Sequence, residues 1–409
     1  MKKVEIYNNR EKQKAAVLKK LHESNISEAD KKLILEFVNY KTEEDRIGII
    51  RQNKYLMHLR ILAEHLKKPF DNATKEDIKK LLNEMYSMNV KRGETVKKIS
   101  ESSKADYTII LKTFYKWLKG TEKPEETAWI KPISVKKKRL RPDEIIQWED
   151  AVLLSKSAMN PRDMAFPQVL WECGGRIGEI LTLKICDVEF VNSGDALVLH
   201  LRESKTELRA IVIVKSAPAL INWLENHPTR NNKDSQLWVK VTKPDKIMNY
   251  TTARKVLIDL KRRSGLDKPV NPHHFRKSGA SHFSHLLTES ETKKRYGWTQ
   301  DSSMLQLYCF PDENRINEKI MQMEGITEKT PEEKQKENEN LKPKRCAWCN
   351  KLNPVGQEYC VLCKRPLNSE QNLLQSQIKE TIDTGILEFT EQHPEFINQY
   401  IEFMREKIK

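Results

Sequence analysis

Residues 195–214, DALVLHLRESKTELRAIVIV, decide the fold class of this 409-residue chain. Leu197, Leu199 and Leu201 alternate with other residues, and residues 211–214 are β-branched throughout. Alternation of this kind is typical of a half-buried strand, and the polar stretch ESKTE between the two runs predicts the tip of a β-hairpin. The sequence on both sides has helical periodicity, so we expect an α+β region dominated by helix over residues 143–326.

Helical patterns fill the sequence before this region. Ser27 and Thr74 each precede an aspartate by three positions, which is the pattern of a capped helix start, and Gly120 is a suitable helix end. The apolar residues that recur at helical spacing are Leu33, Ile34, Phe37, Val38, Tyr55, Leu59, Leu62, Leu66, Ile78, Leu81, Leu82, Met85, Ile110, Phe114, Trp117 and Leu118. Residues 20–130 are therefore expected to form a small helical bundle.

Bulk properties favour a polyanionic partner. The net charge is +15 and the pI about 9.2, and nucleic acid is the commonest partner of so basic a chain. No run of about 18 apolar residues is present, so no transmembrane helix is expected. The first twenty residues lack the apolar run of a signal peptide, so we expect a cytoplasmic protein.

Polar and basic stretches separate the expected domains. Residues 131–142, KPISVKKKRLRP, form a linker that either is solvated or lies along a phosphate backbone. Its basic residues are Lys136, Lys137, Lys138, Arg139 and Arg141. Residues 327–345 are almost wholly polar and are expected to be a flexible linker. Amphipathic helices are expected in the tail, residues 367–409.

A cysteine module occupies residues 346–366. Two CxxC pairs, Cys346 with Cys349 and Cys360 with Cys363, are separated by ten residues. Four thiolates at such spacing are typical of a tetrahedral structural Zn²⁺ site; redox-active cysteines are the alternative. The remaining cysteines, Cys173, Cys186 and Cys309, are expected to be buried thiols.

Five separated motifs carry side chains with catalytic potential. They are GGRIGEI (174–180), the hairpin tip, NPHHFRKSGASH (271–282), YGWTQDSS (296–303) and SSMLQLYCF (302–310). Together they supply Arg176, Glu179, Lys205, His273, Arg276, Trp298 and Tyr308. Asn271 and Pro272 predict a helix start, where backbone N–H groups suit a phosphate. Each side chain taken singly also has an ordinary structural explanation.

The order of these residues, R–K–HxxR–W–Y, resembles the tyrosine recombinase (phage integrase) family. The resemblance runs from about residue 25 to 326, and YTIILKTFYKWL (107–118) is similar to the end of the family's SAM-like core-binding domain. The GW dipeptide and the cysteine module resemble the archaeal branch, in which a zinc ribbon follows the catalytic domain in some integrases. The chain departs from the common pattern at Trp298, where most members have histidine, and the step of ten residues to Tyr308 is one residue longer.

The resemblance implies a site-specific DNA recombinase. Tyr308 would attack a phosphodiester, with His273 as its general base. Arg176 and Arg276 would stabilise the crowded, doubly charged phosphorane. Lys205 would protonate the departing 5′-hydroxyl. The product would be a 3′-phosphotyrosyl link that conserves the phosphodiester energy, so neither ATP nor a catalytic metal is required.

Two further residues have supporting roles in this interpretation. Trp298 has no titratable group, so it would pack the site or hydrogen-bond a phosphate oxygen. Glu179 would orient His273 or an arginine.

Double-stranded DNA is the implied partner, gripped on opposite faces by the helical and catalytic domains. Members of the family act as tetramers on two DNA sites, so we expect a homo-oligomer on DNA and a weaker oligomer or a monomer without it. Ile316, Ile320 and Met323 recur at helical spacing after Tyr308, in a segment that packs on a neighbouring protomer in the family.

Two alternatives remain open on the sequence. One is a DNA-relaxing enzyme similar to type IB topoisomerases, which a relaxation assay without paired target sites would detect. The other is a non-catalytic DNA-binding regulator derived from a recombinase, although every catalytic position is filled.

Neutralising the basic linker tests its contact with DNA. Replacing Lys136, Lys137, Lys138 and Arg139 by alanine should flatten the slope of log affinity against log salt concentration, because each phosphate contact contributes about −0.9. Titrations of labelled duplex at several salt concentrations measure this slope. An unchanged slope would show that the run is solvated.

Overall fold

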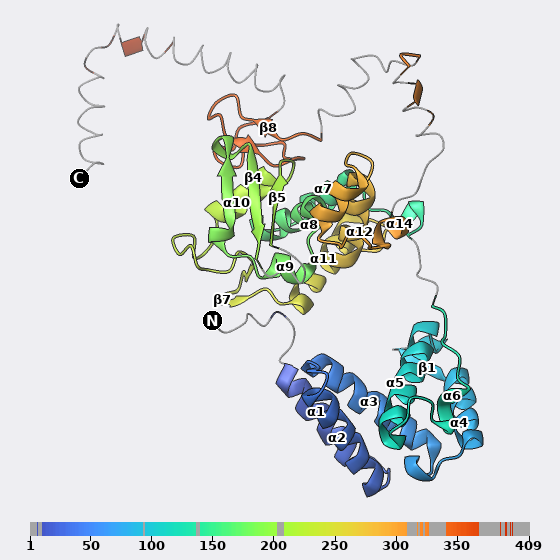
Figure 1. Cartoon of the computed structure of the whole chain (residues 1–409). Helices are drawn as coiled ribbons and strands as arrows, with labels where there is room; N and C mark the ends of the chain where they lie inside the picture. The colour runs from blue at the N-terminus through green and yellow to red at the C-terminus, as the bar shows by residue number, and fades with distance from the viewer. Residues whose placement is uncertain are drawn as a thin grey trace. The chain divides into compact units, whose positions relative to one another are not determined.

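The computed structural model describes residues 10–92, 95–135, 140–202, 208–308 and 341–367, together with isolated positions outside these ranges. The chain divides into two compact units, Met1–Lys138 and Arg139–Lys409 (Figure 1). Among the described residues, no helix is both long and apolar enough to cross a membrane.

The first unit is helical, with one small hairpin. Its elements are α1 (Arg10–His22), α2 (Glu28–Glu43), α3 (Ile49–Leu66), α4 (Lys75–Ser87), β1 (Asn89–Arg92), β2 (Thr95–Lys98), α5 (Glu101–Lys119) and α6 (Glu125–Ala128). The hairpin β1–β2 was not expected, because its short polar strands lack the apolar alternation that marks a half-buried strand.

The predicted helix ends of this unit are confirmed. Ser27 accepts a hydrogen bond from the Asp30 backbone N–H at 3.1 Å, and Thr74 makes a capping box with Asp77. Gly120 ends α5 with a φ of 63°, in the left-handed region that favours glycine.

Aromatic side chains fill the core of the first unit. Phe37 and Phe114 meet edge to face with ring centroids 5.3 Å apart, and Phe70 lies 4.8 Å from Phe114. All three rings are fully buried. This packing joins α2, α5 and the segment before α4 into one bundle.

The second unit combines helices with small antiparallel sheets. Its helices are α7 (Trp148–Lys156), α8 (Pro161–Cys173), α9 (Ile177–Leu181), α10 (Ala217–Glu225), α11 (Tyr250–Ser264), α12 (Pro272–Phe283), α13 (Glu289–Tyr296) and α14 (Met304–Tyr308). Its strands are β3 (Val188–Val191), β4 (Ala196–Leu201), β5 (Arg209–Ile213), β6 (Val239–Lys240), β7 (Lys243–Ile247), β8 (Lys344–Arg345) and β9 (Leu352–Asn353).

The hairpin that decided the fold class supplies two strands of a three-stranded sheet, with β4 at its centre. Strands β4 and β5 pair in antiparallel register, with Leu199 opposite Ile211. Strand β3 extends the sheet in the order β3-β4-β5 and was not expected. The inward residues of β4 and β5 are buried, so the α+β, mainly helical fold class is confirmed.

Helix α8 lies at the centre of the second unit and contacts α7, α10 and α12. Most of its residues are buried, including Trp171, whose indole N–H donates to the Ile146 carbonyl at 2.8 Å. The helix ends at Gly174, which has a φ of 59°. A Cβ at Gly174 would lie 2.4 Å from the ring of Tyr296, so only glycine permits this turn.

The cysteine module and the residues just before it pack on the same unit. Lys351 pairs with Glu225 at the end of α10, and Arg345 pairs with Asp195 before β4. The Trp148 indole donates to the Leu341 carbonyl at 3.2 Å. The module is therefore fixed to the unit through both ion pairs and hydrogen bonds.

Several sequence predictions fall outside the described residues. These are Lys136, Lys137, Lys138, Arg139, Lys205, Cys309, Ile316, Met323 and most of residues 327–340 and 368–409. One prediction about the remaining cysteines is wrong. Cys173 is buried as expected, but Cys186 is exposed because it lies on the short turn between α9 and β3.

A buried carboxylate joins α8 to the start of α10. Glu172 is 5% exposed and accepts hydrogen bonds from the backbone N–H groups of Val214, Lys215 and Ser216 at 2.7–3.0 Å. The Ser216 hydroxyl adds a bond of 2.6 Å. One side chain therefore satisfies the donors of an entire turn.

Replacing Glu172 by alanine should lower the free energy of unfolding by about 3 kcal/mol, because buried donors lose their charged acceptor. Denaturant unfolding measures the change. The exposed Glu149, on α7, provides the control, and its alanine variant should stay within about 0.5 kcal/mol of the parent. A Glu172→Ala loss no larger than that of the control would contradict this interpretation.

Candidate active site and metal site

Arg176 is placed by the turn that ends α8. It follows Gly174 and Gly175 and is the N-cap residue of α9. Its guanidinium donates to Glu179 Oε1 at 2.8 Å and to the Gly297 carbonyl at 2.8 Å. Its backbone N–H donates to Glu179 Oε2 at 2.7 Å. These bonds fix the side chain at one edge of a cleft.

Arg276 comes to the same cleft from α12. The predicted start of this helix is confirmed: Asn271 caps it, and Pro272 occupies its first turn. Arg276 is 5% exposed, and its guanidinium donates to the carbonyls of Gly174, at 2.7 Å, and Tyr296. Burial, together with the charge of Arg176, lowers the pKa of Arg276 to about 10, so the group stays cationic at neutral pH.

The two adjacent histidines of α12 have different surroundings. His274 is buried and its Nε2 lies 2.6 Å from the Glu144 carbonyl, which is a structural contact. His273 is exposed toward the cleft. Partial desolvation, followed by the charges of Lys277 and Arg276, lowers the pKa of His273 below its usual value. The imidazole is therefore neutral at physiological pH and able to accept a proton.

Tyr308 is the last residue of α14 and is only 3% exposed. Its ring centroid lies 6.5 Å from that of His273 and 5.6 Å from that of Trp298. Burial raises the pKa of Tyr308, and the charge of Arg276 partly opposes this effect. The phenol is therefore protonated at neutral pH.

Trp298 forms one wall of the cleft. It stacks on Tyr296 with centroids 5.2 Å apart and an interplanar angle of 24°. The guanidinium carbon of Arg276 lies 5.5 Å from the Trp298 ring centroid and 5.3 Å from that of Tyr296. Both rings thus offer their negative faces to a buried cation.

The cleft has a volume of about 330 Å³. It is lined by Arg176, Ile177, Tyr250, Pro272, His273, Arg276, Trp298, Met304 and Tyr308. Arginine, histidine, tryptophan and tyrosine side chains from motifs far apart in the sequence therefore surround one space. Glu179 lies beneath it, bonded to Arg176, and Lys205 lies outside the described residues.

Three residues at or beside the cleft were not predicted from the sequence. Tyr250, at the start of α11, lines it, and the ammonium of Lys277 lies 5.4 Å from the Tyr308 ring centroid. Arg209, the first residue of β5, pairs with Glu179. The sequence did contain a pattern that indicates a buried Arg209. This residue alternates with Ile211 and Ile213 and so belongs to the buried face of the strand. A buried arginine requires a charged partner.

The described part of the basic linker shows Arg141 as an exposed residue. Its guanidinium lies 3.0 Å from Glu144 and 3.6 Å from Asp143. Both neighbours are acidic, so much of the charge of Arg141 is balanced within the chain.

The two CxxC pairs form matching turns. The backbone N–H of Asn350 donates to the Cys346 carbonyl, and that of Lys364 donates to the Cys360 carbonyl. Both donor residues have positive φ, 55° and 61°. The same local geometry is therefore built twice and presents two pairs of thiols to each other.

The four sulfur atoms of Cys346, Cys349, Cys360 and Cys363 lie within 4.8 Å of one another. The Sγ atoms of Cys346 and Cys363 are 3.5 Å apart, as are those of Cys349 and Cys360. A tetrahedral ion with Zn–S bonds of about 2.3 Å needs sulfur separations of about 3.8 Å. The cluster therefore has the donor set and the size to bind a metal ion.

Comparison with known proteins agrees with this fold. The sequence model of the phage integrase family matches residues 138–315. The chain is 25% identical over 254 residues to the tyrosine recombinase XerC of Alcanivorax borkumensis, covering 60% of this chain and 78% of the relative. It is 27% identical over 241 residues to the probable integrase/recombinase protein MJ0367 of Methanocaldococcus jannaschii, covering 54% and 68%.

Solved structures share the fold. The Tn1549 transposon integrase in complex with transposon right end DNA has a TM-score of 0.52 at 12% identity, covering 71% of this chain and 99% of that one. The XerH recombinase bound to palindromic difH substrate has a TM-score of 0.51 at 16% identity, covering 78% and 98%.

The fold and the matches define a class of enzymes that break and rejoin DNA strands. Residues 138–315 are a phage integrase family domain, and the chain is similar to tyrosine recombinases.

Proposed function

We propose that this protein is a site-specific recombinase or integrase that cleaves and rejoins DNA through a 3′-phosphotyrosyl link to Tyr308. The observation that carries the proposal is the meeting of Tyr308 with Arg176, Arg276 and His273 around one cleft. The phosphodiester energy is kept in the tyrosyl bond, so a second strand's 5′-hydroxyl reverses the step without ATP.

The arginines act on the charge that develops during attack. Carbonyl oxygens hold Arg176 and Arg276, and Glu179 also holds Arg176. A guanidinium has five N–H donors, and further donors of each group serve the non-bridging phosphate oxygens. Because the groups are already oriented, little reorganisation is needed when the phosphorane forms.

The proton of Tyr308 passes to His273. Burial disfavours a free phenolate, because it raises the pKa of Tyr308. His273 is exposed on the same cleft and its pKa is lowered, so it is in the neutral form that accepts a proton. Removal of the proton during attack avoids an isolated buried anion.

The remaining residues have supporting roles in the proposal. Lys205 protonates the departing 5′-hydroxyl from the tip between β4 and β5. Trp298 packs the cleft beside Tyr308. Glu179 orients an arginine rather than His273, an assignment supported by its bonds to Arg176.

The proposed organisation assigns residues 20–130 to core binding and residues 143–326 to catalysis. Residues 131–142 then link the two around a DNA duplex, and four protomers act on two sites. The segment after Tyr308 joins neighbouring protomers in this proposal.

The cysteine module is proposed to hold a structural Zn²⁺ ion, as in archaeal-type integrases. Its Gln357 contacts Met164 near the start of α8, whereas Arg176 follows the end of the helix. The nine residue steps from Met164 to the end of α8 at Cys173 rise about 14 Å along the helix. The ion would therefore support local folding and take no part in cleavage.

The Tyr308→Phe variant tests the nucleophile. A nicked suicide substrate should trap the parent protein covalently, whereas Tyr308→Phe should bind DNA and form no adduct, because only the attacking oxygen is lost. Tyr250→Phe, at another tyrosine of the cleft, should still form it. Arg176→Ala and Arg276→Ala should slow adduct formation by about 100-fold or more. Denaturing gels measure the adduct, and its persistence in Tyr308→Phe would contradict the assignment.

Metal analysis tests the cysteine module. Protein purified without chelator should contain about one zinc per chain. The double variant Cys346→Ser, Cys349→Ser should lose the ion while the circular dichroism of the helices is retained. Cys186→Ser, at an exposed cysteine outside the cluster, should keep it. A parent protein without metal would refute the zinc proposal.

A further inference from the structure

We propose that Arg209 is a positioning residue that holds Glu179 and keeps the Arg176 site cationic for attack on the phosphate. The inference rests on the proposed function, because it assigns a role within the same cleavage reaction. It concerns a residue whose side chain does not line the cleft and which belongs to none of the five sequence motifs.

The ion pair between Arg209 and Glu179 is buried and bidentate. Arg209 Nη2 donates to Glu179 Oε2 at 2.6 Å, and Nη1 donates to Oε1 at 3.3 Å. The side chains are 7% and 2% exposed. Burial alone would raise the pKa of Glu179, but the charge of Arg209 and the hydrogen bonds from both arginines hold it below its usual value. The carboxylate is therefore ionised.

Each oxygen of Glu179 is shared between the two arginines. Oε1 accepts from Arg176 Nη1 at 2.8 Å as well as from Arg209. Oε2 accepts from the Arg176 backbone N–H at 2.7 Å as well as from Arg209. Rotation of the carboxylate would break hydrogen bonds to both arginines. Arg209 therefore fixes the orientation of the Glu179 carboxylate, which in turn positions Arg176.

Arg209 also changes the net charge beside the cleft. Arg176 and Glu179 alone would form a neutral pair and offer a phosphate little net attraction. With Arg209 the three groups carry a net charge of +1. Arg209 thus lets Glu179 orient Arg176 without cancelling the charge that the reaction requires.

Gly297 shows how closely this cluster is packed. Its carbonyl accepts from Arg176 Nη2 at 2.8 Å. A Cβ at this position, where φ is 59°, would lie 2.4 Å from Arg209 Nη1 and 3.3 Å from Arg176 Nη1. The chain before Trp298 therefore lies against both guanidinium groups, and a side chain at this left-handed position would displace Arg209.

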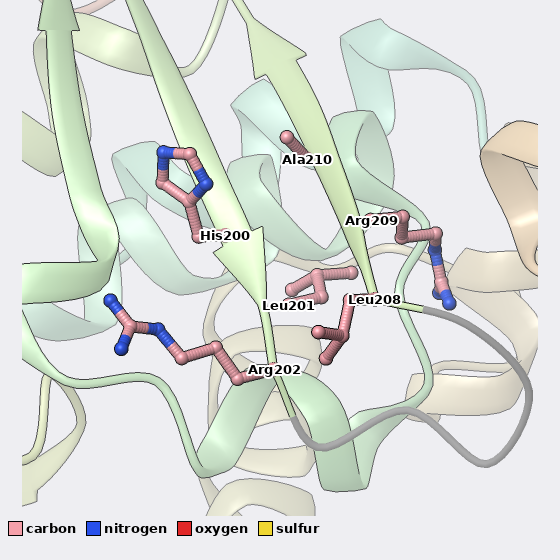
Figure 2. Close-up of a pocket in the computed structure, with 6 residues that line it drawn as sticks. All are labelled: His200, Leu201, Arg202, Leu208, Arg209 and Ala210. Atoms are coloured by element: carbon pink, nitrogen blue, oxygen red, sulfur yellow. The ribbon is translucent and has the colours of Figure 1, made fainter.

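The opposite strand of the hairpin supplies a matched control. Arg202 follows β4 beside the same tip and also makes an ion pair, with Asp187 at 2.5 Å. Figure 2 shows Arg202 and Arg209 extending to opposite sides of the hairpin. Arg202 is 65% exposed and its partner lies away from the cleft. The Arg202→Ala variant therefore shows the effect of losing an ion pair of this hairpin away from the cleft, and Arg209→Ala can be compared with it.

The first experiment measures single-turnover adduct formation at saturating protein, together with DNA affinity and thermal unfolding. Arg209→Ala should reduce the rate by about 10- to 100-fold and change DNA affinity less than about two-fold, because the loss is realised in the transition state. Arg209→Lys should recover part of the rate, since it restores the charge but not the fork. Arg202→Ala should react within about two-fold of the parent.

A substrate with a neutral methylphosphonate at the scissile position separates positioning from general damage. Removing the phosphate charge reduces the need for a cation, so the defects of Arg209→Ala and Arg176→Ala should both shrink to about three-fold or less. A defect of Arg209→Ala that is equal on both substrates would overturn the inference, as would a parent-like rate on the ordinary substrate.

A bridging 5′-sulfur substrate, whose leaving group needs no proton, provides the final discrimination. It should leave the Arg209→Ala defect in place. Full rescue by sulfur would show that Arg209 acts through the leaving-group proton and would overturn the assignment to Glu179 and Arg176. If the parent protein forms no adduct on any of these substrates, the proposed function fails. If the parent reacts and Arg209→Ala reacts equally well, only this inference fails.

Discussion

The structure depends on holding two like-charged guanidinium groups, one of them buried, at one cleft. Arg176 and Arg276 face one cleft, and burial, followed by the charge of Arg176, lowers the pKa of Arg276. Backbone carbonyls of Gly174, Tyr296 and Gly297 accept their N–H groups, and Glu179 supplies a compensating charge. Such pre-oriented donors suit a reaction in which negative charge grows on phosphate oxygens.

Much of the second unit can be understood as support for this arrangement. The central helix α8 ends at a left-handed glycine and delivers Arg176, while α12 begins at an asparagine cap and delivers His273 and Arg276. Aromatic rings of Tyr296 and Trp298 cover the Arg276 guanidinium. Helices α8 and α12 are thereby held together at the cleft that Arg176, His273 and Arg276 line.

The parts of the fold that depend on local pattern could be predicted from the sequence. Caps at Ser27, Thr74 and Asn271 and the strands around the hairpin tip follow from short-range chemistry. The strand β3 and the hairpin β1–β2 were missed, because both are short and their pairing is set by partners rather than by alternation. Arg209 was missed because its partner, Glu179, lies thirty residues away in the sequence.

The central claim is that the cleft makes Tyr308 the residue that becomes joined to DNA. The most direct measurement is mass spectrometry of the trapped complex after nuclease and protease digestion. The account predicts one modified peptide, with a nucleotide linked through its 3′ phosphate to the Tyr308 oxygen. A nucleotide on another side chain, or one linked through a 5′ phosphate, would contradict the account.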